Sequence, residues 1–124
     1  KVKKMEIVKS TVTDNAKRYV MMRGPQVKKL SDFVDKEVKL VNFILYTNET
    51  VNPDDENAEA VQSKVLTLEF ENGSMAATNS PTFIKEFEVL LAAFDDKLEG
   101  IPSITIIKQK SNKGREFINF KLEL

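Results

Sequence analysis

The chain has 124 residues, of which 41% are hydrophobic and 31% charged, and its 19 cations balance its 19 acids. This size and composition predict one globular domain, and the lack of any run of about 18 apolar residues excludes a membrane span. There is no cysteine and no histidine, which excludes disulfides, thiolate nucleophiles, histidine acid–base catalysis and ordinary zinc sites. We therefore expect a non-catalytic cytoplasmic protein without metal or cofactor.

Charge is distributed unevenly along the chain. Residues 1–37 carry ten cations and five acids, residues 38–100 four cations and twelve acids, and residues 101–124 five cations and two acids. Two basic ends around an acidic middle are typical of a protein that binds a polyanion on one face. The alternative is that these charges serve only solubility.

Residues 1–37 read as an N-terminal extension that is partly helical and partly an arm. The run NAKRYVMMR predicts a helix, capped by Asp14 or Thr13 and ended by Gly24-Pro25, and VKKLSDFVDKE predicts a further short helical turn. The extension has too many apolar side chains for a disordered tail. They either cover the protein's own surface or dock on a neighbouring copy, and for docking we name Val2, Met5, Ile7 and Val8.

Three strands are predicted next. VKLVNFILYT (38–47) is apolar on both faces and predicts a buried strand, whereas residues 48–63 are acidic and predict a long mobile loop. KVLTLEFE (64–71) alternates and predicts a half-buried strand. Asn72-Gly73 predicts a tight hairpin turn in which both residues have positive φ, and SMAATN (74–79) returns as a third strand.

One helix and two strands complete the chain. Ser80 and Pro81 are typical first residues of a helix, and Phe83, Phe87, Leu90 and Phe94 form its apolar stripe. SITIIKQ (103–109) and FINFKLEL (117–124) predict strands joined by a hairpin loop.

This order of elements predicts an all-β OB-fold: a five-stranded barrel over residues 38–124, with one helix between its third and fourth strands. Such barrels bind oligonucleotides or oligosaccharides on one face and its loops. An α+β sandwich of the same elements is the alternative fold.

The last hairpin contains the strongest candidate site. Its cations suit phosphate oxygens, Gly114 lets the backbone approach a ligand closely, and Phe117 alternates away from the core side chains, so bases could stack on its ring. On the first strand, Phe43 and Tyr46 lie on opposite faces, so one of them should reach the ligand unless Phe43 packs in the core. The predicted nucleic-acid-binding residues are Phe43, Tyr46, Lys108, Gln109, Lys110, Asn112, Lys113, Gly114, Arg115, Phe117 and Asn119.

The runs KVLTLEFENGSMAATNSPTFIKEFEVLL, ITIIKQKSNKGREFINFKLEL and STVTDNAKRYVMMRGPQVKKLSDF resemble the small OB-fold single-stranded DNA-binding proteins of Gram-positive phages and conjugative plasmids. The resemblance covers nearly the whole chain. It implies binding of single-stranded DNA with little sequence preference, during replication or conjugative transfer. The sequence leaves the choice between DNA and RNA open.

Two other functions compete with this hypothesis. A protein-interaction adaptor would use the same basic hairpin and arm to dock on an acidic partner. A metal-dependent enzyme would use the oxygen ligands Asp54, Asp55, Glu56 and Glu59, but consecutive acids in such a loop are more typical of a solvated segment.

Overall fold

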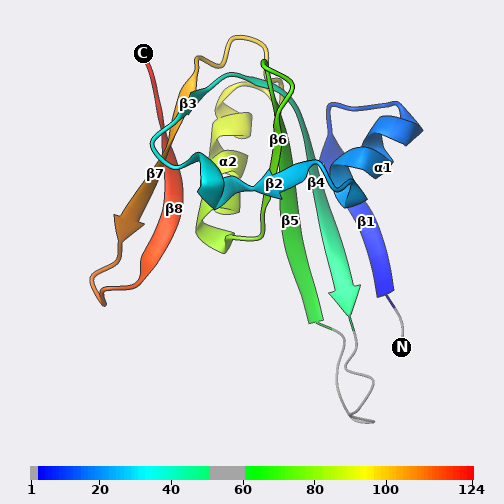
Figure 1. Cartoon of the computed structure of the whole chain (residues 1–124), viewed down its shortest axis with the longest axis horizontal. Coiled ribbons are helices and arrows are strands. Elements are labelled where there is room, and N and C mark those ends of the chain that lie inside the picture. Colours follow the sequence, from blue (N-terminus) through cyan, green and yellow to red (C-terminus); the bar gives the residue numbers. More distant parts are fainter. Residues whose placement is uncertain (1–2, 51–60) are drawn as a thin grey trace.

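The computed structural model describes residues 3–50 and 61–124 of the chain. Within them, eight strands form a five-stranded and a three-stranded sheet, accompanied by two α-helices and one short 3-10 helix (Figure 1). The elements are β1 (Lys3–Ser10), α1 (Asn15–Arg23), β2 (Val27–Lys29), η1 (Leu30–Phe33), β3 (Glu37–Val38), β4 (Leu40–Thr50), β5 (Val61–Phe70), β6 (Met75–Thr78), α2 (Pro81–Ala93), β7 (Ile104–Lys110) and β8 (Glu116–Leu122).

The larger sheet has the strand order β1-β4-β5-β6-β2, and the smaller has the order β3-β7-β8. All neighbouring strands are antiparallel except β2 and β6, which are parallel. Only Lys39 separates β3 from β4. The chain therefore passes directly from the smaller sheet into the larger one.

The main core lies where α2 packs against both sheets. Helix α2 begins at Pro81, and the Ser80 side chain caps it by accepting a hydrogen bond from the Phe83 backbone N–H at 3.3 Å. The ring of Phe87 packs on Phe43 of the larger sheet, with their centroids 5.3 Å apart. The ring of Phe83 packs on Phe120 of the smaller sheet, with a centroid distance of 5.2 Å. Helix α2 thus packs against both sheets.

A second, smaller core lies on the opposite face of the larger sheet, where α1 covers it (Figure 1). Its buried members are Val12, Met21, Ile44 and Tyr46. The Asp14 side chain caps α1 by accepting from the Lys17 N–H at 2.8 Å. At the other end of α1, a Cβ on Gly24 would meet the Val20 carbonyl oxygen at 2.4 Å, so this close approach requires glycine.

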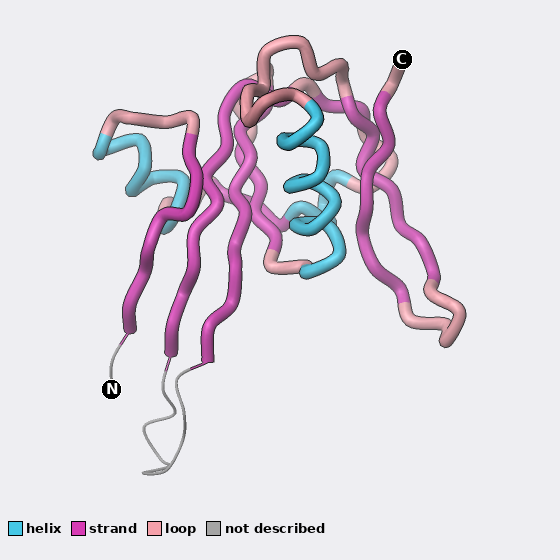
Figure 2. The backbone as a smooth tube through the Cα atoms, turned by 180° about the vertical axis from the view of Figure 1, so that it is seen from behind, coloured by secondary structure: helices cyan, strands magenta, loops and turns pink. Residues whose placement is uncertain are grey.

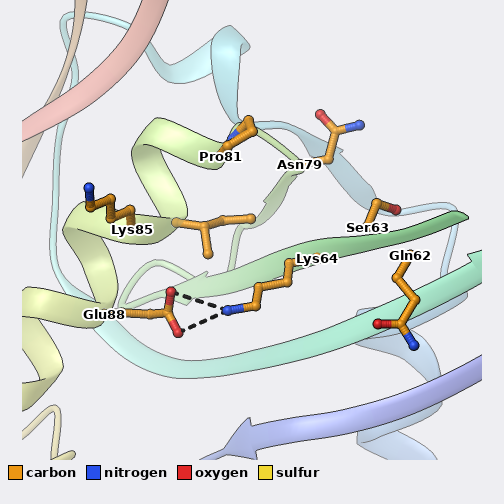
Figure 3. A pocket seen from close by; sticks show the side chains of 8 residues that line it. Gln62, Ser63, Lys64, Asn79, Pro81, Lys85 and Glu88 are labelled. Carbon is orange, nitrogen blue, oxygen red and sulfur yellow. Dashed lines mark hydrogen bonds and ion pairs between the residues drawn. The ribbon is translucent and has the colours of Figure 1, made fainter.

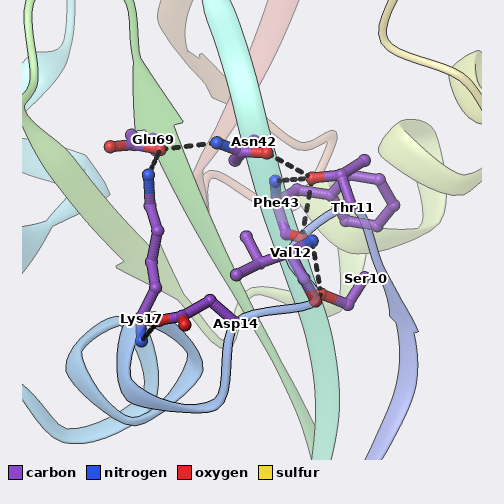
Figure 4. A network of polar contacts seen from close by, with 8 residues as sticks. All are labelled: Ser10, Thr11, Val12, Asp14, Lys17, Asn42, Phe43 and Glu69. Carbon is purple, nitrogen blue, oxygen red and sulfur yellow. Dashed lines mark hydrogen bonds and ion pairs between the residues drawn. The ribbon is translucent and has the colours of Figure 1, made fainter.

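A polar network fastens the N-terminal segment to the larger sheet (Figure 4). Thr11 Oγ1 donates to Asn42 Oδ1 at 2.9 Å, and Asn42 Nδ2 donates to Glu69 Oε1 at 2.7 Å. Lys17 of α1 forms an ion pair with the same carboxylate at 2.9 Å. Burial raises the pKa of Glu69, but the hydrogen bonds from Asn42 and Lys17, together with the charge of Lys17, more than offset it and leave the pKa below the ordinary value.

The β5–β6 hairpin and the β7–β8 hairpin each turn through a glycine at positive φ. Gly73, with φ of 90°, donates its N–H to the Phe70 carbonyl at 2.9 Å, and Gly114, with φ of 81°, donates to the Ser111 carbonyl at 2.9 Å. Asn72 is not at positive φ. The Asn-Gly hairpin is therefore confirmed, but it is a three-residue loop with a terminal glycine rather than the two-residue turn expected from the sequence.

The predicted fold class is wrong. Residues 3–50 and 61–124 form a mixed α/β structure with two sheets, neither of them closed into a barrel. The predicted order of elements after residue 37 is confirmed in β4, β5, β6, α2, β7 and β8. Among the described strands β8 pairs only with β7, and α2 packs against both sheets, so no barrel closes there.

The sequence assigns residues 1–37 to an extension, but residues 3–37, the described part of it, lie within the two sheets and their cores. They supply β1, β2 and the first residue of β3, while Leu30 and Phe33 belong to the main core. The predicted helix over residues 15–23 is confirmed as α1. Of the predicted loop over residues 48–63, the two ends extend β4 and β5 as strand, and residues 51–60 lie outside the described part.

Candidate nucleic-acid interface

The hairpin of β7 and β8 has two distinct faces. Ile104 and Ile106 are buried in the main core, and Ile118, Phe120 and Leu122 pack against it. Alternate residues along both strands therefore point away from the core. They form what we call the outer face, which consists of Thr105, Ile107 and Gln109 on β7 and their cross-strand partners Lys121, Asn119 and Phe117 on β8. The predicted outward direction of Phe117 is thus confirmed.

Phe117 and Ile107 are the apolar members of the outer face, and both are half-buried. Gln109 lies directly opposite Phe117 in the strand register, and Asn119 lies opposite Ile107. A flat apolar ring with amides beside it is suited to stacking and hydrogen bonding with a planar heterocycle. Sequence reasoning omitted Ile107 from the site, although its alternation with Ile106 places it there.

The hairpin tip is ordered by backbone hydrogen bonds and carries exposed cations. Ser111 exchanges bonds with Arg115: its N–H donates to the Arg115 carbonyl at 2.9 Å, and its Oγ accepts from the Arg115 N–H at 3.2 Å. In the views of Figures 1 and 2, this tip projects past the end of α2. Four exposed cations surround it, and none forms an ion pair within residues 3–50 and 61–124: Lys108, Lys110, Lys113 and Arg115.

The hairpin strands and the residues just after them contain two acids, Glu116 and Glu123, and each lies near a cation or a hydrogen-bond donor. Glu123 accepts a hydrogen bond from Thr105 and lies 3.9 Å from Lys121 Nζ. Glu116 stands opposite Lys110 in the register. The hairpin therefore has a positive surplus at its tip, where Asn112 and Lys113 are exposed beside Gly114.

The structure does not bring the first-strand aromatics to this surface. The Phe43 ring is 2% exposed in the main core, and Tyr46 is 5% exposed in the second core, where its hydroxyl donates to the Met22 carbonyl at 3.3 Å. Burial raises the pKa of Tyr46, and the charge of Arg23 opposes that rise only in part. The expectation that either ring stacks on bases is wrong because both sheet faces are covered.

The predicted self-association residues lie on or near an edge of the larger sheet. Strand β1 pairs with β4 on one side and with no other described strand. Ile7 is 38% exposed and Val8 is 47% exposed. Met5 instead packs against the second core, and Val2 lies outside the described residues.

A pocket of about 380 Å³ lies elsewhere, between β5 and α2 (Figure 3). The Lys64 ammonium, which lines it, forms an ion pair with Glu88 at 3.3 Å. Its other lysine, Lys85, forms no ion pair among the described residues, so the pocket offers a phosphate one unpaired cation where the hairpin offers four. Among the described residues, no group of acids is arranged to hold a metal ion, and the predicted loop ligands Asp54, Asp55, Glu56 and Glu59 lie outside them.

Comparisons with protein-family models, with curated proteins and with solved structures found no match. No helix in residues 3–50 and 61–124 is long and apolar enough to cross a bilayer. The cytoplasmic location expected from the sequence stays a prediction.

Proposed function

We propose that this protein binds single-stranded DNA, without catalysis and with little sequence preference, during replication or conjugative transfer. The observation that carries the proposal is the hairpin of β7 and β8. Four exposed cations that form no ion pair with any described residue lie around its tip, and the outward-facing Phe117 lies next to that tip. RNA with the same single-stranded chemistry is the second ligand to test.

The physical basis is the match between two features of the hairpin and two features of a single strand. Phosphates are held by cations, and Arg115 can contact two phosphate oxygens at once. Unpaired bases stack on aromatic rings, with a contribution of about 1–3 kcal/mol per base. A duplex hides its base faces, so the half-buried but outward-facing Phe117 ring beside cations favours the single strand.

Other surfaces support the proposal less well. The pocket between β5 and α2 has a single lysine without an ion pair in the described part of the chain, Lys85. On β5, Glu69 is held by Lys17 and Asn42 beneath the N-terminal segment. The loops after α2 carry Asp95, Asp96 and Glu99, which would repel phosphates. Compared with these surfaces, the hairpin and its outer face fit a phosphate better, and we place the binding surface there.

The test is fluorescence anisotropy with labelled oligo-dT at about 50 and about 200 mM salt, because phosphate contacts release counterions and make affinity fall with salt. Changing Lys110, Lys113 and Arg115 together to Ala should weaken binding and flatten the salt dependence by roughly 0.7–1 unit of slope per lost contact.

The matched control changes three exposed lysines outside the hairpin, Lys28, Lys85 and Lys97, to Ala, which removes the same charge. It should leave the slope nearly unchanged. An equal loss in both triple variants would mean that net charge, rather than the hairpin, attracts DNA. No binding by the unaltered protein would favour the alternative function, a protein-interaction adaptor.

We also propose that copies of the protein associate side by side along the strand through β1. Ile7 and Val8 are exposed on an edge strand, and an unpaired edge is a template for another chain. Cooperative binding along a strand is usual for proteins of the proposed class. Light scattering with and without oligonucleotide, on the unaltered protein, Val8→Lys and the control Val41→Lys, measures this association.

A further inference from the structure

Two amide side chains on the outer face are connected in a chain of hydrogen bonds. Asn119 Oδ1 accepts from the backbone N–H of Phe120 at 2.9 Å. Asn119 Nδ2 donates to Gln109 Oε1 at 3.0 Å. Gln109 itself lies across the strand from Phe117, the ring proposed to stack on bases.

This chain fixes which way both amides point. A backbone N–H can only donate, so Asn119 must turn its oxygen toward Phe120 and its amino group toward Gln109. The Asn119 amino group also can only donate, so the Gln109 atom that faces it must be the amide oxygen, which accepts. The Gln109 amino group therefore stands at the end of this series of hydrogen bonds. Neither of its N–H groups has an acceptor in the described part of the protein.

The neighbours of this amino group on the outer face are apolar. The Phe117 ring lies across the strand from Gln109, and Ile107 precedes Gln109 by two residues on β7. Lys108 and Lys110 adjoin Gln109 along the strand, but alternation directs them to the other face of the hairpin. The two amide oxygens each already accept one hydrogen bond. The free hydrogen-bonding group beside Phe117 is therefore the Gln109 amino group, which is a donor.

We propose that the Gln109 amino group donates a hydrogen bond to a carbonyl oxygen of a base stacked beside Phe117, as thymine and uracil provide; the inference rests on the proposed binding of single-stranded nucleic acid. Thymine presents the acceptors O2 and O4 to such a donor. A base of the same shape without these acceptors cannot receive the bond. Gln109 is thus a specificity residue beside a sequence-tolerant stacking ring.

The experiment must separate hydrogen bonding from the ease with which different single strands unstack. We therefore compare oligo-dT with an oligonucleotide of the same length in which thymines are replaced by difluorotoluene, which keeps the shape of thymine but lacks its strong acceptors. Both are titrated by anisotropy into the unaltered protein, into Gln109→Met and into the control Gln62→Met. Gln62 is an exposed glutamine on β5 that donates to Glu49 and lies away from the outer face.

The unaltered protein and Gln62→Met should bind oligo-dT about threefold to tenfold more tightly than the mimic, as expected for one net hydrogen bond. Gln109→Met should bind the two alike. An equal ratio in the unaltered protein, or a ratio that Gln109→Met keeps, overturns the inference while leaving the proposed function standing. Failure of oligo-dT to bind the unaltered protein at all overturns the proposed function instead. Because Gln109 is exposed, unchanged unfolding temperatures will show that the variants remain folded.

Discussion

Phe117 is the residue on which the proposed stacking depends. It is half-buried on the outer face, and its ring is directed away from the main core. Phe117→Ala should therefore weaken oligo-dT binding by about 1–3 kcal/mol and change stability little. Anisotropy and urea unfolding measure the two effects.

Phe120, three residues further along β8, is the matched comparison. Its ring packs on Phe83 at 5.2 Å, so Phe120→Ala should lower the free energy of unfolding by about 3 kcal/mol. If Phe117→Ala destabilised the protein as much as Phe120→Ala and left binding intact, Phe117 would serve packing rather than stacking.

Glu69 should make stability depend on pH. Its folded pKa is lowered, so the stabilisation from its ionised form is present above the unfolded pKa and is lost as pH falls through the folded pKa. Glu69→Gln should lower the free energy of unfolding by about 1–2 kcal/mol near neutral pH. The difference from the unaltered protein should shrink toward about pH 3.

Denaturant unfolding at both pH values checks this expectation. Glu71→Gln is the control, because Glu71 is exposed two residues away and has no ion pair in the described part of the chain. A constant difference across the pH range in Glu69→Gln would mean that its charge contributes nothing to stability.

At the scale of elements, β1 is the strand proposed to join neighbouring copies. A charge on an exposed edge residue blunts strand pairing between molecules. Val8→Lys should therefore reduce the mass measured by light scattering on oligo-dT and the cooperativity of binding, while single-site affinity is kept. Val41→Lys, at an exposed valine of β4, is the control. Unaltered cooperativity in Val8→Lys would show that β1 only completes its own sheet.

At the scale of the whole molecule, β1 should be needed for the fold as well. It pairs with β4, and Lys9 forms an ion pair with Asp96 beyond α2 at 2.9 Å. Thr11, which follows β1, bonds to Asn42 and Phe43. Deleting residues 1–11 should lower the unfolding temperature by more than about 5 °C, since each kcal/mol lost shifts it by several degrees.

Circular dichroism melting measures that loss. An unchanged melting temperature would mean that residues 12–124 form an independent unit and that β1 is a detachable arm. This deletion cannot test self-association by itself, because it exposes the β4 edge at the same time.

The sequence by itself determined the local elements and the direction of side chains along them. Asp14 and Ser80 cap α1 and α2 as expected, and alternation correctly placed Phe117 opposite Ile118 and Phe120. These features could be predicted because caps and strand alternation depend on residues a few positions apart. The cationic hairpin tip could be predicted for the same reason, because its cations and Gly114 lie within a few residues of one another.

The tertiary structure alone decided how these elements meet. Whether the sheet closes depends on what packs beside β8, and α2 occupies that place. The burial of Tyr46 depends on α1, which precedes it by more than twenty residues and covers the sheet face that the sequence left open for a ligand. Such outcomes follow from contacts between segments far apart in the chain, for which local pattern and propensity provide no signal.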